Sequence, residues 1–223
     1  MNEVIGAVLP SALAIALSPV PIIAVIVMLR SPDGKGKSVA FLIGWLLGIL
    51  IGVVAFTALE SIIPATSPAA APVIFGVIAV VIGVALVLLA AGQLRTRPGE
   101  GEEAGLPGWL NAIDSLTVAH AGIFGLVFAV AKPKNLLLLI SGGLIMGAAG
   151  LEFWQLAIST SVFVIVAASS VLIPVIAYLI AASKLDGPLE NLHEWLVAHN
   201  SALIASVMFI VGIVLIGAGI SAF

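Results

Sequence analysis

The stretch Ser18-Pro19-Val20-Pro21 interrupts a long hydrophobic segment near its middle, and Lys132-Pro133-Lys134-Asn135 does the same in a second segment. Both segments are long enough to cross a bilayer, which takes about 20 apolar residues in a helix. Proline has no amide hydrogen, and its ring opposes the preceding helical turn. Each stretch therefore predicts a helix that is broken inside the membrane, and a broken helix in hydrocarbon is a candidate binding site.

The composition indicates a polytopic membrane protein. Hydrophobic residues make up 62% of the 223-residue chain and charged residues only 9%, whereas charged residues make up about a quarter of an ordinary soluble domain. There is no basic patch, so nucleic acid is not an expected partner, and there is no cysteine for disulfide or thiol chemistry. His120, His193 and His199 are scattered, so we expect no metal site and no cofactor. The expected partners are membrane lipids and the transported solute.

Six hydrophobic segments should each form a transmembrane helix in an all-α fold. We expect these helices at residues 4–29, 39–59, 72–94, 116–147, 154–180 and 202–220. The basic residues outside the segments lie in alternate loops, which should therefore face the cytoplasm: Arg30, Lys35, Lys37, Arg95, Arg97 and Lys184. This pattern predicts a multi-pass protein of the cytoplasmic membrane with both termini outside.

The organisation of the chain indicates two inverted repeats. Residues 95–115 should form a cytoplasmic linker that ends in an interfacial segment, and they separate residues 1–94 from residues 116–223. Each half then holds three helices, and an odd number makes the second half enter the membrane from the opposite side. Both halves begin with a broken helix. Paired broken helices in inverted repeats are typical of secondary transporters, which bind their substrate near the midplane.

The residues at the two breaks suggest what the site would bind. The prolines should leave backbone carbonyls without partners, and the helix that resumes after each break presents free amides that attract an anion. Lys132 and Lys134 add two positive charges, and a lysine near the bilayer centre marks a cavity, a partner or a substrate path. The alternatives are a plain proline kink, and a shorter helix whose lysines extend to the interface. We expect an anionic group to bind here.

Two other features bear on mechanism and assembly. Glu60, Asp114 and Glu152 lie at predicted helix ends, so coupling through a buried carboxylate is not supported, and the sequence does not choose between proton, sodium or no coupling ion. Gly44, Gly48 and Gly52 form a smooth face along the second helix. Such a face suits either close packing within one subunit, which we favour, or a homodimer.

The ordered set of motifs resembles one family. The two proline stretches are joined by Arg30-Ser31-Pro32-Asp33-Gly34-Lys35-Gly36-Lys37, Gly44-Trp45-Leu46-Leu47-Gly48, and Trp109 with Ala112-Ile113-Asp114. Together they look like the GAP (Sap) family of peptidoglycolipid or sulfolipid addressing proteins, in the LysE superfamily of six-helix exporters. Relatives often have Asn where Lys132 stands. The resemblance implies a role in moving glycolipids or their precursors toward the cell envelope, whereas other superfamily branches export amino acids or other small solutes.

Carried over to this chain, the resemblance implies a central substrate site and a cytoplasmic gate. The gate or loop clamp would consist of Asp33 and Lys37. The central site would consist of Ser18, Pro19, Pro21, Lys132, Pro133, Lys134 and Asn135.

The expected function is a secondary exporter of a glycolipid, a lipid precursor or a small anionic solute, working by alternating access. An amino-acid exporter is an alternative, and so is a non-catalytic subunit that needs an envelope export partner. An enzyme fits poorly, because no carboxylate pair or metal cluster lies at depth.

Overall fold

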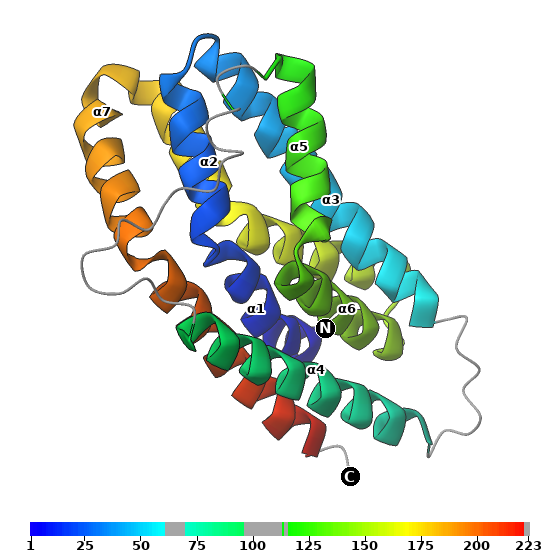
Figure 1. Ribbon diagram of the computed structural model, residues 1–223. Coiled ribbons are helices and arrows are strands. Elements are labelled where there is room, and N and C mark those ends of the chain that lie inside the picture. Colours follow the sequence, from blue (N-terminus) through cyan, green and yellow to red (C-terminus); the bar gives the residue numbers. More distant parts are fainter. Residues whose placement is uncertain (61–69, 96–112, 114–115, 221–223) are drawn as a thin grey trace.

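The computed structural model describes residues 1–60, 70–95, 113 and 116–220. Apart from short turns and caps, these residues are helical (Figure 1). The elements in chain order are α1 (Asn2–Ala16), α2 (Pro19–Arg30), α3 (Gly34–Glu60), α4 (Ala70–Arg95), α5 (Val118–Ala131), α6 (Pro133–Ala148) and α7 (Phe153–Ile220). Except for Arg95 and Ile113, the linker expected at residues 95–115 lies outside the described residues.

The two predicted breaks are confirmed. α1 and α2 together are long and apolar enough to cross a membrane, but they are bent by 50° at their junction. α5 and α6 form a second such pair, bent by 71°. Pro19 and Pro133 are the first residues of α2 and α6. Proline suits this first helical position, because the amide that it lacks would have no partner inside the helix.

The rest of the described chain supplies two further candidate spans and two shorter apolar helices. α3 and the first part of α7, Phe153–Ala181, are continuous helices with the length and hydropathy of a span. Two shorter apolar stretches, Gly76–Gly92 and Ala202–Gly217, lie in α4 and in the last part of α7. Large apolar side chains also point outward along α3, among them Ile43, Leu47 and Ile51. Together these features indicate a multi-pass membrane protein.

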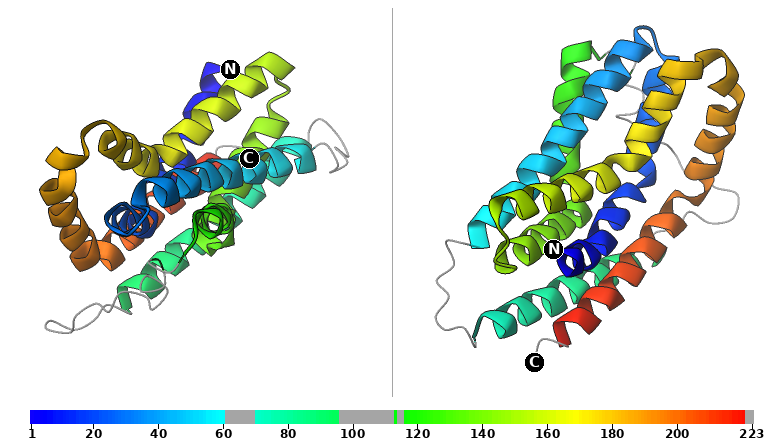
Figure 2. Two further views of the ribbon diagram at one scale, coloured as in Figure 1. Left: turned by 90° about the horizontal axis from the view of Figure 1, so that it is seen from above. Right: turned by 180° about the vertical axis from the view of Figure 1, so that it is seen from behind.

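α7 differs from the sequence prediction at its centre. We expected a loop between residues 180 and 202, but helix continues through this stretch after a bend at Ala181, the residue with non-helical backbone angles. Leucines recur there every three or four residues, and Leu189 and Leu196 are buried. That spacing gives a helix one apolar face, so the polar residues between residues 184 and 199 occupy the other positions of a helix. Figure 2 shows this bent helix from two further sides.

The glycine face of α3 packs within the chain, as we favoured, and the expectation of a homodimer through it is wrong. A Cβ atom at Gly44 would overlap the backbone oxygen of Gly122 on α5. One at Gly48 would lie 2.6 Å from the oxygen of Leu126, and one at Gly52 would lie 2.8 Å from Leu139 of α6. The three glycines are buried against α5 and α6. They therefore cannot also contact a second copy.

Similar close packing joins α4 to the last part of α7, and these two segments lie side by side in Figures 1 and 2. A Cβ atom at Gly83 would lie 2.6 Å from the oxygen of Gly212, and one at Gly219 would lie 2.6 Å from that of Gly76. Small residues allow such close approach, which is a main source of helix association in membranes. The last part of α7 is therefore packed closely against α4.

Candidate site at the paired helix breaks

The first break is formed by Leu17 and Ser18. α1 ends at Ala16, and Ser18 adopts an extended conformation at the N-cap of α2. The last carbonyls of a helix have no intrahelical amide to accept from. Leu17 N–H still donates to the carbonyl of Leu13, at 2.8 Å. Ser18, Pro19 and Pro21 are all buried, whereas Leu17 is 56% exposed, so only the serine and proline side of this break faces protein.

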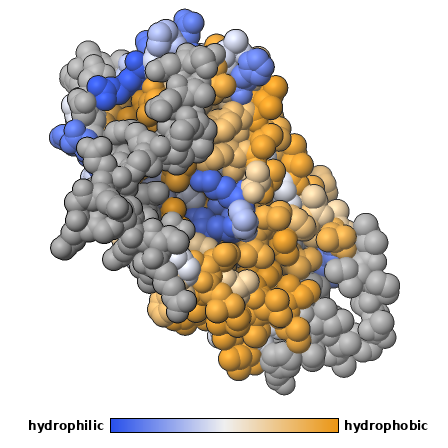
Figure 3. Space-filling view, in the orientation of Figure 1, coloured by the Kyte–Doolittle hydropathy of each residue, from blue (hydrophilic) through white to orange (hydrophobic). Residues whose placement is uncertain are grey.

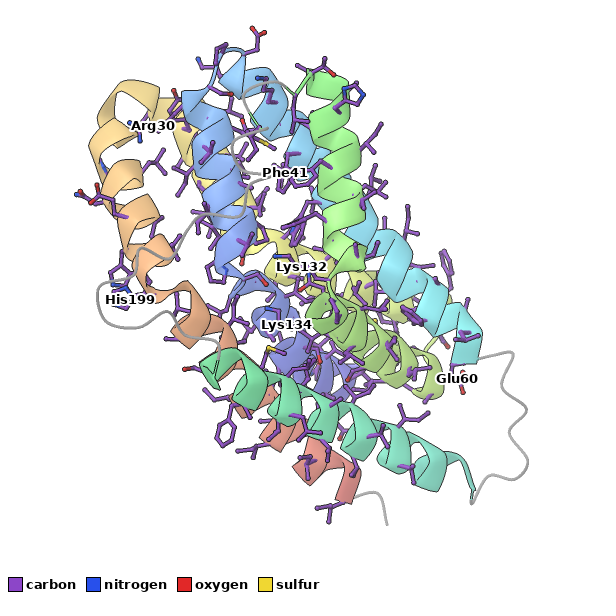
Figure 4. The ribbon with its side chains drawn as sticks, viewed as in Figure 1. Arg30, Phe41, Glu60, Lys132, Lys134 and His199 are labelled. Atoms are coloured by element: carbon purple, nitrogen blue, oxygen red, sulfur yellow. The ribbon has the colours of Figure 1, made fainter. Side chains whose placement is uncertain are left out.

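The second break is formed by Lys132 alone. This residue is extended and serves both as the C-cap of α5 and as the N-cap of α6. It lies between helices of 14 and 16 residues, so it is central in the α5–α6 pair. Figure 4 shows Lys132 and Lys134 near the centre of the molecule, while Arg30 and Glu60 lie far from them at opposite sides.

Lys134 joins the two breaks. Its Nζ donates to the carbonyl oxygen of Ala14 at 2.8 Å and to Ser18 Oγ at 2.6 Å. Ala14 is in the last turn of α1, where a positive charge also interacts favourably with the helix dipole. The Lys134 side chain is only 8% exposed. A residue of the second broken helix thus supplies the hydrogen bond that the end of α1 lacks.

At the second break, the Asn135 side chain supplies a hydrogen bond to a carbonyl of α5. Its Nδ2 donates to the carbonyl oxygen of Ala129, at 3.2 Å. Pro133 would deprive this carbonyl of its usual donor four residues on, as the sequence predicts. The Oδ1 atom of the same amide is buried and has no hydrogen-bond partner. Because a carbonyl can only accept, the amide nitrogen must face Ala129, and the free acceptor is the oxygen.

Lys132 has a different environment from Lys134. It is half-buried, and its Nζ lies 4.0 Å from the centroid of the Phe128 ring, which is a favourable cation–π distance. Phe128 belongs to an aromatic cluster between α3 and α5 that also contains Phe41, Trp45 and Phe124. Within the described part of the chain, no carboxylate forms an ion pair with Lys132 or Lys134.

The surface at this site is polar, and the surface around it is mostly apolar. Figure 3 shows a hydrophilic patch in the middle of an otherwise mostly hydrophobic face. Figure 4, in the same orientation, labels Lys132 at that place. A polar patch at the centre of membrane helices needs a polar neighbour, because leaving charge against hydrocarbon is costly.

The expected gate residues lie away from the breaks. Asp33 is exposed in the turn between α2 and α3, and its φ of 58° lies in the left-handed region. Lys37 is buried in the first turn of α3, where its N–H donates to the carbonyl of Asp33 at 3.0 Å. The 12 residues of α2 separate this turn from Ser18, which is about 18 Å at 1.5 Å per residue. The structure brings Ser18, Lys134 and Asn135 together, but not Asp33 and Lys37 with them.

Four further polar atoms are buried away from the breaks. The side-chain atoms Ser11 Oγ, Ser159 Oγ, Ser170 Oγ and Trp45 Nε1 are buried without hydrogen-bond partners. Sequence reasoning missed the contact of Lys134 with Ala14 and Ser18, which leaves no local signal because the residues are more than 100 positions apart.

Comparison with known protein families identifies the family of this chain. Neither the curated proteins nor the solved structures contain a match to this chain. The family described as Sap, sulfolipid-1-addressing protein, matches residues 8–221, nearly the whole chain. The resemblance that the motifs indicated is therefore confirmed, and the protein is a membrane protein of the Sap, sulfolipid-1-addressing, family.

Proposed function

We propose that the protein is a secondary membrane transporter that moves an anionic lipid across the cytoplasmic membrane and binds its headgroup at the paired helix breaks. The observation that carries this proposal is the meeting of the two breaks at Lys134, with a second lysine beside it and no paired carboxylate in the described part of the chain. Uncompensated positive charge at this depth favours an anionic ligand. The family description, which names a sulfolipid, supports a lipid with a sulfate or phosphate headgroup.

Alternating access would use two inverted halves that rock about the site. The halves contact each other in both directions: α3 of the first half packs on α5 and α6, and α7 of the second half packs on α1 and α2. Proline is the first residue of the second helix in each broken pair. In such transporters one repeat moves against the other around a fixed binding site. Asp33 and Lys37 would act as the cytoplasmic gate of this cycle.

The distribution of charge supports an orientation with the Arg30 end in the cytoplasm and the Glu60 end outside. Arg30 lies at one end of the molecule and Glu60 at the other (Figure 4). A Cβ atom at Gly147 would lie 2.7 Å from Glu60 Cβ, so the turn after α6 lies at the Glu60 end. The positive-inside rule places the Arg30 end in the cytoplasm. The Glu60 end then faces outward.

Transport by the purified protein tests this function. Proteoliposomes would be supplied with fluorescent phosphatidylglycerol, with phosphatidylcholine that carries the same chains and label, and with basic and neutral amino acids, each with and without a proton gradient. We expect net movement of the anionic lipid but not of phosphatidylcholine. Amino-acid flux without lipid movement would refute the lipid assignment. Absence of all flux would refute a self-sufficient transporter and favour a subunit that needs an export partner.

A further inference from the structure

The two lysines that flank Pro133 have different hydrogen-bonding states. An ammonium group has three N–H donors. Lys134 uses two of them on Ala14 and Ser18, at 2.8 and 2.6 Å, in a buried position. Lys132 is half-buried, and its described contact is with the face of Phe128. An aromatic face attracts a cation but replaces few of its hydrogen bonds. The donors of Lys132 therefore remain open to an anionic oxygen.

We propose that Lys132 is the cation that binds the anionic group of the substrate, and that Lys134 is a positioning residue that holds the two breaks together. This division of roles rests on the proposed function and replaces the expectation that both lysines engage the substrate. One donor of Lys134 stays unused, but its side chain is only 8% exposed, so full contact with a ligand would pull it from the Ala14 carbonyl, which would then be buried without a donor. Such a loss is costly in a medium of low dielectric.

Asn135 offers the ligand a hydrogen-bond acceptor in addition to the positive charge of Lys132. Lys132 is the N-cap residue of α6, and Asn135 lies three residues later. Both residues therefore belong to the first turn of α6, next to the second break. Asn135 Oδ1 is a buried acceptor without a partner. The site therefore suits a headgroup that combines an anionic oxygen, for Lys132, with a hydroxyl or amide donor, for Asn135.

Lipid binding tests the role of Lys132. Fluorescent phosphatidylglycerol and matched phosphatidylcholine would be titrated into the full-length protein in neutral detergent micelles. We expect Lys132→Gln to weaken phosphatidylglycerol binding about tenfold and to abolish the preference over phosphatidylcholine, because one charge-assisted hydrogen bond is lost. Lys132→Arg should retain the preference. Lys35→Gln, which removes one charge from an exposed lysine in the first turn of α3, is the matched control and should bind like the wild type.

Unfolding tests the role of Lys134 independently of any ligand. A double-mutant cycle would compare the Tm values of Ser18→Ala, Lys134→Met and the double variant. We expect both single variants to have a lower Tm than the wild type. The Tm of the double variant should be close to that of Lys134→Met, because the two residues share one hydrogen bond. Additive losses would contradict the contact. Because Ser18→Ala removes only one hydroxyl, it keeps the test usable if Lys134→Met fails to fold.

The outcomes separate this inference from the proposed function. If the wild type shows no preference for phosphatidylglycerol, the proposed function and the role of Lys132 both fail, while the double-mutant cycle still decides the role of Lys134. If the wild type has the preference but Lys132→Gln retains it, the division of roles is wrong. Loss of the preference in Lys134→Gln at an unchanged Tm would also overturn it.

Discussion

Replacing Gly48 with alanine should destabilise the protein, because the new methyl group has no room between α3 and α5. Its Cβ would lie 2.6 Å from the backbone oxygen of Leu126 and 2.7 Å from Ala129 Cβ, whereas ordinary contact begins at 3.4 Å. The helices would have to separate by about 0.8 Å, the difference between 3.4 and 2.6 Å, because neither neighbour is the end of a flexible side chain. Overpacking of this kind costs about 1–3 kcal/mol.

The assay is thermal unfolding followed by tryptophan fluorescence in detergent micelles. In a chain of this size, each kcal/mol of lost stability lowers the Tm by about 2–4 °C. Gly6→Ala is the matched control, because a Cβ atom at Gly6 would have no neighbour within 4 Å. Alanine should be neutral or stabilising there, owing to its higher helix propensity.

The oligomeric state of the same variants tests the packing within one chain. We expect Gly48→Ala to change the Tm without changing the molecular mass of the protein in micelles. Equal Tm values for the Gly48 and Gly6 variants would refute the reasoning. A loss of dimer at an unchanged Tm would show that the glycine face belongs to an interface between copies.

Three further predictions concern the stability of local structure, each measured by reversible chemical unfolding. Asn135→Ala should lower the unfolding free energy by about 1–3 kcal/mol, because the buried carbonyl of Ala129 loses its donor; an unchanged value would mean that this hydrogen bond is not needed. Asp33→Gly should be about 1–2 kcal/mol more stable than Asp33→Val, because the φ of Asp33 is 58°, and the reverse order would contradict the left-handed backbone. Thr117→Ala should cost about 1 kcal/mol, because Thr117 Oγ1 accepts from the His120 N–H at the start of α5; no loss would exclude an energetic role for this cap.

The breaks could be predicted from sequence because proline acts locally. Pro19 and Pro133 remove a backbone donor wherever the helix is packed, and both begin a new helix in the structure. Asn135 lies close to the second break in sequence, so its capping of Ala129 follows the same local logic.

The contact between the breaks could not be predicted in the same way. Lys134 bonds to Ala14 and Ser18 only because α6 packs against α1, and that packing depends on the whole chain. The pattern of Gly44, Gly48 and Gly52 similarly identified a contact face without identifying its partner. The expected loop between residues 180 and 202 was wrong, because the leucines in this polar stretch give it the apolar face of a helix.

The most direct test of an anionic headgroup at the breaks is site-specific photo-crosslinking in a bilayer. A benzophenone side chain would replace Ala131, which is exposed beside Lys132, or Ile43, which is 52% exposed on α3. Clickable phosphatidylglycerol and phosphatidylcholine with the same chains would be compared at each position. The account predicts that position 131 labels the anionic lipid in clear preference, while position 43 labels both lipids alike. Equal labelling of the two lipids at position 131 would contradict it.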